Sequence, residues 1–254
     1  MRKTIRILIL LLLPTLCFAG LQEKQCAVIA QKNATVACTD ANPVGNCTGF
    51  LICQNFEQTV EACDPCTEDN SETWDKTLAG TGTITVDYGT ALRGTESLQV
   101  LSDGSNAITI EETFADQGTV YGFFRVKLAD GRPTSTNLVL LQNNSTTIGR
   151  ISILNTGVFR LYNGTVSVDS TTALDDGATG TIYVWFYWTK ATSGDGTMGI
   201  EVNTSRTFGA WEATGATGDA TLDMNKITLT DRYIGGVVFD QVLLKASAIG
   251  TVCE

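Results

Sequence analysis

The feature of this sequence that most limits its fold is a succession of short alternating runs from about residue 50 onward. The runs are rich in Val, Ile and Thr, and apolar and polar residues alternate along them. Successive side chains of an extended chain point to opposite faces, so this pattern predicts β-strands with one buried face. The runs are TITVDY (83–88), SLQVLS (97–102), AITIEETF (107–114), VYGFFRVKLA (120–129), NLVLLQ (137–142), RISIL (150–154) and VFRLY (158–162).

Turn signals separate these runs, and no helical signal competes with them. Asn-Thr-Gly at 155–157 and Ser-Gly-Asp-Gly at 193–196 are typical of hairpin turns. No segment sustains a helical period for three turns. A chain of 254 residues with 43% hydrophobic content can bury the core of one large β-domain. We therefore predict an all-β fold, a two-sheet antiparallel jelly-roll sandwich.

The first 19 residues have the pattern of a secretory signal peptide. A basic start is followed by the apolar run ILILLLL at 7–13, and Ala19 provides the small residue at the cleavage point. The alternative, a membrane anchor, needs about 18 to 20 apolar residues, and this run ends at Pro14. We expect a secreted or cell-surface protein whose mature chain begins at residue 20.

The charge of the chain excludes two classes of partner. The full sequence has 17 basic and 27 acidic residues, a net charge of −10, and signal cleavage makes the remainder more acidic. Nucleic acid and anionic membranes attract basic surfaces, so we expect no nucleic-acid partner and no membrane insertion after cleavage. No other apolar run is long enough to span a bilayer.

Cysteines gather at the front of the mature chain, where residues 20–49 form a cysteine-rich N-terminal segment. In an exported protein such a cluster predicts disulfides. The chain has no histidine, which argues against a zinc site at CDPC (63–66). The number of candidates is odd, so one thiol is left over, and the pairing stays open. The candidates are Cys26, Cys38, Cys47, Cys53, Cys63, Cys66 and Cys253.

Six short motifs, in the order in which they follow one another along the chain, resemble concanavalin A-like jelly-roll domains of the laminin-G type. The resemblance places such a domain at residues 50–247 and leaves 248–254 as a C-terminal tail. A galactose-binding-like module, also a jelly roll, shares the NFE start and the FDQV end and is the alternative. The motifs are ICQNFE (52–57), SETW (71–74), LRGTESLQV (92–100), RISILNTGVFRLYNGT (150–165), SGDGTMGIEVN (193–203) and GGVVFDQVLLK (235–245).

The run TIYVWFYWTK at 181–190 is apolar on both of its faces. The resemblance implies a central strand whose odd-numbered aromatic residues enter the core. It thereby puts Phe186 and Trp188 on the outer face. Aromatic rings there could stack on sugar rings, so these two residues are the candidate ligand-binding residues. The alternative is that a neighbouring loop or the cysteine-rich segment covers them.

The sequence offers little catalytic chemistry. Glycan-cleaving enzymes of this fold resemble one another in an E-x-D-x-x-E motif, or in motifs that use His, Tyr and Arg, and neither is present. Glu111, Glu112 and Asp116 are the closest carboxylate cluster, but hydrolysis needs two carboxyl groups facing each other across the bond. Without histidine, nucleophiles activated by Ser-His or Cys-His pairs are excluded. We expect no enzyme and no catalytic residue.

These observations favour a non-catalytic, lectin-like protein that binds a glycan or polysaccharide. The alternative is a structural surface protein, an adhesin or a filament subunit that associates with itself or with other surface proteins. In that case an extended strand from residues 20–49 would add to the edge of a neighbour's sheet. A glycan-cleaving enzyme is the third hypothesis.

The resemblance also implies a structural calcium site that ties the first strand to the last. Glu57 in NFE and Asp240 in FDQV occupy the matching positions. Ca²⁺ suits such a site because it accepts six to eight oxygen ligands in irregular geometry. The alternative is that both are ordinary exposed carboxylates at strand ends.

Overall fold

The structure is a computed structural model, and it describes the part of the chain that forms the β-domain. The described residues are 50–54, 56, 74–77, 81–85, 97–128, 135–174, 180–218, 221–232 and 235–250. All regular secondary structure among them is β-strand. Within these ranges no helix is long and apolar enough to cross a membrane. The signal peptide, the cysteine-rich segment, Glu57 and every candidate cysteine except Cys53 lie outside the described residues.

The first of two sheets, which we call sheet A, has eight strands. Its order is β13-β12-β11-β6-β15-β4-β3, and β1 also pairs with β15. The strands are β1 (Phe50–Gln54), β3 (Thr83–Thr85), β4 (Leu98–Leu101), β6 (Thr119–Leu128), β11 (Ile182–Thr189), β12 (Gly196–Asn203), β13 (Ala213–Gly218) and β15 (Val237–Lys245).

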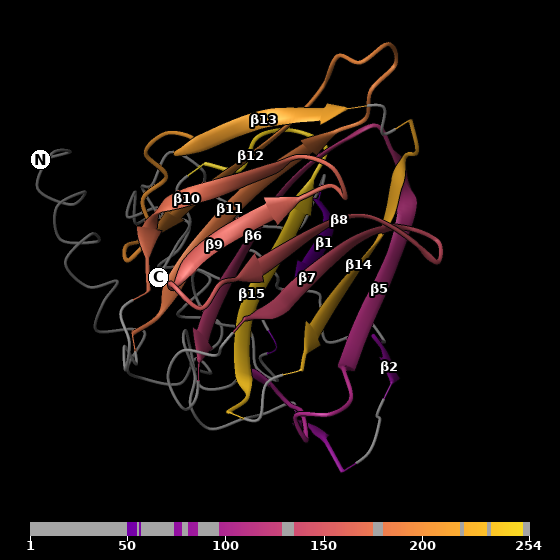
Figure 1. Ribbon diagram of the computed structural model, residues 1–254. Helices are drawn as coiled ribbons and strands as arrows, with labels where there is room; N and C mark the ends of the chain where they lie inside the picture. Colours follow the sequence, from indigo (N-terminus) through magenta and orange to yellow (C-terminus); the bar gives the residue numbers. More distant parts are fainter. Residues whose placement is uncertain are drawn as a thin grey trace, which may run out of the picture. The chain divides into compact units, whose positions relative to one another are not determined.

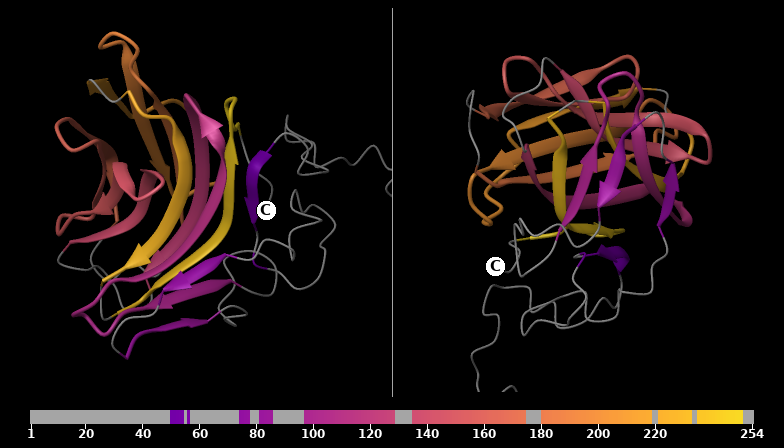
Figure 2. Two further views of the ribbon diagram at one scale, coloured as in Figure 1. Left: turned by 90° about the vertical axis from the view of Figure 1, so that its right-hand side faces the viewer. Right: turned by 90° about the horizontal axis from the view of Figure 1, so that it is seen from below.

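Sheet B has seven strands in the order β10-β9-β8-β7-β14-β5-β2, and Figure 1 shows it in front of sheet A. Its strands are β2 (Asp75–Thr77), β5 (Ile108–Gln117), β7 (Thr136–Asn143), β8 (Thr146–Ile153), β9 (Val158–Tyr162), β10 (Ser167–Ala173) and β14 (Met224–Asp231). The sheet curves, and its outer face is on the concave side (Figure 2, left).

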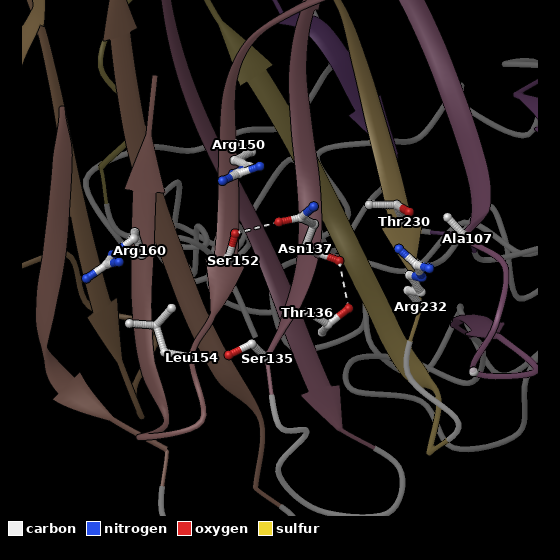
Figure 3. Close-up of a pocket in the computed structure, with 11 residues that line it drawn as sticks. Ala107, Ser135, Thr136, Asn137, Arg150, Ser152, Leu154, Arg160, Thr230 and Arg232 are labelled. Atoms are coloured by element: carbon white, nitrogen blue, oxygen red, sulfur yellow. Dashed lines mark hydrogen bonds between the residues drawn. The ribbon is translucent and has the colours of Figure 1, made fainter. Parts of the chain in front are cut away.

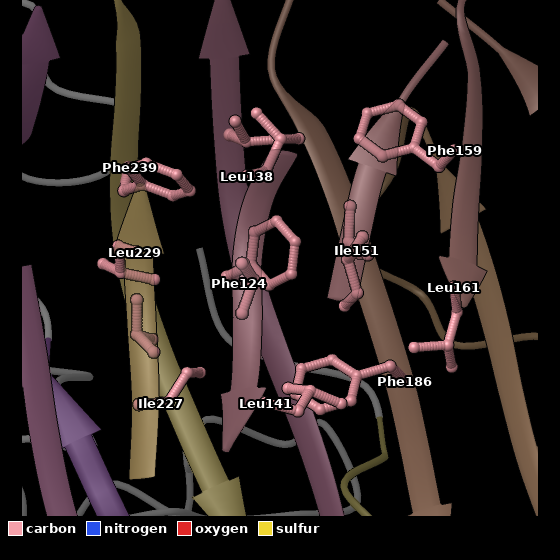
Figure 4. Packing of buried hydrophobic residues seen from close by; sticks show 14 of the residues in the cluster. Phe124, Leu138, Leu141, Ile151, Phe159, Leu161, Phe186, Ile227, Leu229 and Phe239 are labelled. Carbon is pink, nitrogen blue, oxygen red and sulfur yellow. The ribbon is translucent and has the colours of Figure 1, made fainter. Parts of the chain in front are cut away.

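The two sheets pack face to face around one apolar core. Alternate residues of each strand enter this core, among them Phe124 and Phe239 from sheet A and Ile151 and Leu229 from sheet B (Figure 4). All strand pairs in both sheets are antiparallel. The prediction of an all-β, two-sheet antiparallel sandwich is confirmed.

The predicted orientation of the aromatic strand is wrong. Phe186 and Trp188 of β11 are 0% exposed and lie in the core between the sheets. Gly122 is opposite Phe186 in the neighbouring strand β6. A Cβ atom at Gly122 would lie 2.0 Å from the Phe186 ring, so the missing side chain makes room for that ring on the core face. Phe186 and Trp188 are too deeply buried to stack on a sugar.

The other face of β11 is covered by the chain itself. Trp185 is 0% exposed, and its indole N–H donates to the carbonyl of Gly250 at 3.2 Å. Phe208 packs edge-on against Trp185 with ring centroids 6.0 Å apart. Cys53 of β1 is buried in the same cluster. A second, smaller core therefore forms on the outer face of sheet A, beneath the segment 204–212 and the segment after β15.

Candidate functional site

The most chemically distinctive cavity lies on the outer face of sheet B, and we call it the arginine pocket. It has a volume of about 610 Å³ and is lined by residues of β7, β8, β9 and β14 together with the segments at their ends (Figure 3). Alternation explains the lining: Ile151 and Ile153 of β8 enter the core, so Arg150 and Ser152 face outward. The same strands that build the core therefore present polar side chains to this cavity.

Three arginines line the pocket, out of five in the part of the chain that the structure describes. Arg150 and Arg232 are exposed, and neither forms an ion pair with a described carboxylate. The guanidinium of Arg150 lies over the ring of Tyr162, 4.8 Å from its centroid. The hydroxyl of Tyr162 donates to the carbonyl oxygen of Gly164, which fixes the ring under Arg150.

Arg160, the third arginine, is held by a carboxylate. Its Nε and Nη2 atoms donate to the two oxygens of Asp169 on β10, at 2.6 and 2.7 Å. These hydrogen bonds lower the pKa of Asp169 and raise that of Arg160. The positive charge that the pocket offers to a ligand therefore comes chiefly from Arg150 and Arg232.

Neutral hydrogen-bonding groups lie between the arginines. The Ser152 hydroxyl donates to Asn137 Oδ1 at 2.7 Å, which orients the Asn137 amide at the pocket wall (Figure 3). Thr230 of β14 completes this part of the lining. Beyond it, the Thr228 hydroxyl donates to Gln142 Oε1 at 2.5 Å. Hydroxyl and amide groups in this arrangement suit the hydroxyl groups of a sugar.

The three carboxylates of β5 do not face one another as a hydrolytic pair. Glu111 is joined to Lys226 Nζ at 3.2 Å. Burial, with a smaller contribution from the charge of Asp75, raises the pKa of Glu112. Asp116 accepts a hydrogen bond from Asn225 Nδ2 at 2.9 Å. Glu111 and Asp116 are therefore each held by a local partner.

The calcium site is only partly within the described residues, because Glu57 lies outside them. Asp240 is 0% exposed, so the alternative of an exposed strand-end carboxylate is wrong for this residue. It lies opposite Arg125 in the antiparallel register of β15 and β6. Within the described ranges no three His, Cys, Asp or Glu residues are grouped to hold a metal. The calcium site stays a prediction.

Sequence reasoning missed the arginine pocket. The signal was present as R-I-S at 150–152 and R-L-Y at 160–162, which place a cation and a hydroxyl group on the same face of each strand. The sequence could not show that Arg232, some 70 residues further along the chain, directly follows the strand β14, which pairs with β7. Neighbouring strands in the sheet, not neighbouring positions in the chain, assemble the pocket.

Comparison with known proteins gives similarity at the level of structure. No family model matches the chain, and no curated protein matches it by sequence. An endo-β-1,4-glucuronan lyase from the fungus Trichoderma reesei is similar with a TM-score of 0.54 and 15% identity, over 72% of this chain and 94% of the lyase. The globular domain of T. cruzi calreticulin is similar with a TM-score of 0.51 and 8% identity, over 78% of this chain and 89% of that domain.

A third similar structure is the binding domain of botulinum neurotoxin DC in complex with SialylT. Its TM-score is 0.50 and its identity 12%, over 80% of this chain and 49% of that domain. This chain therefore spans about half the length of the toxin domain that it matches.

The glucuronan lyase contradicts the expectation that this chain is not an enzyme, because a polysaccharide lyase has the same fold. That expectation rested on the lack of histidine and of known hydrolase and lyase motifs. Elimination needs a group that neutralises the substrate carboxylate and a group that moves a proton, and arginine and tyrosine supply such groups. At these identities the comparisons establish one property: the chain folds as a jelly-roll β-sandwich, in agreement with its resemblance to concanavalin A-like domains.

Proposed function

We propose that the arginine pocket binds an acidic polysaccharide built from uronate sugars. The observation that carries this proposal is the presence of Arg150 and Arg232, neither paired with a described carboxylate, in one cavity of a protein whose net charge is −10. Guanidinium groups bind carboxylates through paired, charge-assisted hydrogen bonds. On an otherwise acidic surface, these two arginines concentrate the attraction for an anionic ligand at one place.

The neutral lining of the pocket fits the rest of a sugar chain. Asn137, Ser152 and Thr230 present amide and hydroxyl groups between the two arginines. Neighbouring strands lie about 4.8 Å apart, which is close to the length that one pyranose residue adds to an extended chain. A polysaccharide that crosses the strands would therefore meet a new strand with each successive sugar.

We further propose that the protein cleaves the bound chain by β-elimination. In this reaction a base removes the C5 proton of a uronate, and the C5 electron pair forms a C4=C5 double bond. The C4–O4 bond breaks, and the glycosidic oxygen leaves on C1 of the neighbouring sugar and takes up a proton. Neutralisation of the uronate carboxylate by Arg150 would make the C5 proton more acidic, because it stabilises the charge that develops. Tyr162, held against Arg150, is the candidate for proton transfer.

The similarity to a glucuronan lyase supports the reaction class, and the predicted export would place the protein where extracellular polysaccharides occur. Neither a histidine nor a pair of facing carboxylates is required for this chemistry. The reaction therefore agrees with what the pocket contains.

The test is to incubate the purified mature protein with polyglucuronate, alginate and a neutral glucan. Binding is measured by affinity electrophoresis and calorimetry, and cleavage by the ultraviolet absorbance of the unsaturated product. Arg150→Gln should weaken binding and abolish cleavage, whereas Tyr162→Phe should retain binding and lose cleavage. Arg206→Gln, which changes an arginine outside the pocket, is the matched control and should leave both unchanged.

Two results would overturn parts of the proposal. Failure of every polyuronate to bind, or binding that is insensitive to Arg150→Gln, would refute the ligand assignment. Binding that depends on Arg150 without any unsaturated product, for any substrate, would refute the elimination reaction while leaving the ligand assignment in place.

A further inference from the structure

The outer face of sheet B has a charge gradient across its strands. Starting at Arg150 on β8, the antiparallel register runs to Leu140 on β7 and then to Thr228 on β14. It continues to Glu111 on β5 and ends at Asp75 on β2. These residues are direct neighbours in one row across the sheet, so their side chains lie on the same face.

The two ends of this row have opposite character. Three strand steps separate Arg150 from Glu111, about 14 Å, and one further step reaches Asp75. Glu111 is compensated by Lys226 at 3.2 Å. Asp75 is exposed, and no hydrogen bond or ion pair joins its carboxylate to another described residue. The β2 edge therefore carries negative charge that no described residue neutralises.

The pKa of Glu112 on β5 is affected by the same negative charge at the β2 edge. The charge of Asp75 adds to burial in raising the pKa of Glu112. The carboxyl groups of Glu112 and Asp75 thus influence each other at the β5–β2 edge. Among the described residues, Glu111 is the one carboxylate at this edge that contacts a cation. A uronate placed over this edge would be repelled, whereas an uncharged sugar would not.

We infer that the protein selects a mixed polysaccharide, with an acidic sugar over β8 and β14 and a neutral sugar over β5 and β2. This inference rests on the proposed function and sharpens its substrate class. Arg150 on β8 attracts carboxylates at one end of the row, and Arg232, just after β14, adds to this attraction within the pocket. Asp75 repels carboxylates at the opposite end of the row. A polymer made only of uronates would have to place a charge beside Asp75.

The experiment compares two oligosaccharides of equal length, one made only of glucuronate and one in which glucuronate alternates with N-acetylglucosamine, as in hyaluronan. Their affinities are measured by calorimetry for the parent protein, for Asp75→Asn and for Asp75→Lys. Asp116→Asn is the matched control, since it removes one exposed carboxylate about 17 Å along β5 from Glu111.

The parent should bind the alternating oligosaccharide more tightly. A single charge at 5 to 10 Å in water corresponds to about a two- to fourfold change in affinity. Asp75→Asn should therefore strengthen binding of oligoglucuronate by about that factor, Asp75→Lys by more, and Asp116→Asn by little. The gain should shrink as salt is raised, because exposed charges are screened.

The possible failures are distinguishable. If neither oligosaccharide binds the parent protein, the inference is refuted, whereas the proposed function is refuted only when alginate and polyglucuronate fail to bind as well. If both bind equally and neither Asp75 variant alters the ratio, the selection by the β2 edge is refuted, while the proposed function stands.

Discussion

Glu201 of β12 provides a sharp test of how this domain balances burial against charge. Its side chain is 3% exposed beneath the segment 204–212. Oε1 accepts a hydrogen bond from the backbone N–H of Gly209 at 2.7 Å, whereas no described residue lies within hydrogen-bond geometry of Oε2. Burial is the main cause that raises the pKa of Glu201, and the nearby charge of Glu212 adds to it. We predict that Glu201→Gln stabilises the protein at neutral pH.

The magnitude follows from the unpartnered oxygen. A buried polar group without a partner costs about 1 to 3 kcal/mol, more when it is charged. Glutamine keeps the acceptor for Gly209 and removes the charge, but its amide nitrogen also lacks a partner, so a gain of about 1 kcal/mol is expected. For a domain of this size, that corresponds to a rise of about 2 to 4 °C in Tm.

The pH dependence distinguishes this cause from a simple packing effect. A carboxyl group whose folded pKa is raised above its unfolded value of 4.5 stabilises the fold at low pH, and this stability is lost as pH rises through the folded pKa. The advantage of Glu201→Gln should therefore be small near pH 4 and reach its full size near pH 8.

The assay is thermal and denaturant unfolding of both proteins from pH 4 to pH 8. Glu212→Gln is the contrasting control, because Glu212 accepts hydrogen bonds from the hydroxyls of Thr171 and Thr172 at 2.9 and 2.6 Å. This variant should be less stable than the parent protein. If Glu201→Gln is no more stable than the parent at pH 8, or if its advantage is the same at every pH, the argument from a buried charge is wrong.

Three further predictions concern the core, the ion pair and the metal. Gly122→Ala would bring a methyl group within 2.0 Å of a core phenylalanine ring and should cost about 1 to 3 kcal/mol in denaturant unfolding, whereas Gly180→Ala, with open space around it, should cost far less. Asp169→Asn should release Arg160 and strengthen polyuronate binding in calorimetry, while the free energy of unfolding falls by no more than about 1 kcal/mol, since the pair is over a third exposed. Calcium at a hundredfold excess over Kd should raise the Tm of the parent protein by about 2 to 4 °C. Magnesium should not raise this Tm, and calcium should not raise the Tm of Asp240→Asn. If calcium causes no specific rise in the parent, the calcium site is refuted.

The sequence by itself determined the local structure of the domain. VFRLY at 158–162 is the strand β9, and AITIEETF begins the strand β5. Gly157 and Gly194 adopt the left-handed backbone conformation in the two predicted turns, with φ of 83° and 80°. Strand alternation and turn chemistry depend on residues close together in the chain, so they can be inferred before any tertiary contact is known.

Only the tertiary structure decided which face of β11 enters the core and where the ligand pocket lies. Both faces of β11 are apolar, so alternation could not choose between them. A neighbouring glycine makes room for a ring on each face, Gly122 for Phe186 and Gly199 for Tyr187, so only the packing of the two sheets decided the choice. Arg150 lies on β8 and Arg232 directly follows β14, and these two strands flank β7. Their convergence depends on strand order and register, which arise from packing between distant segments and leave no local trace in the sequence.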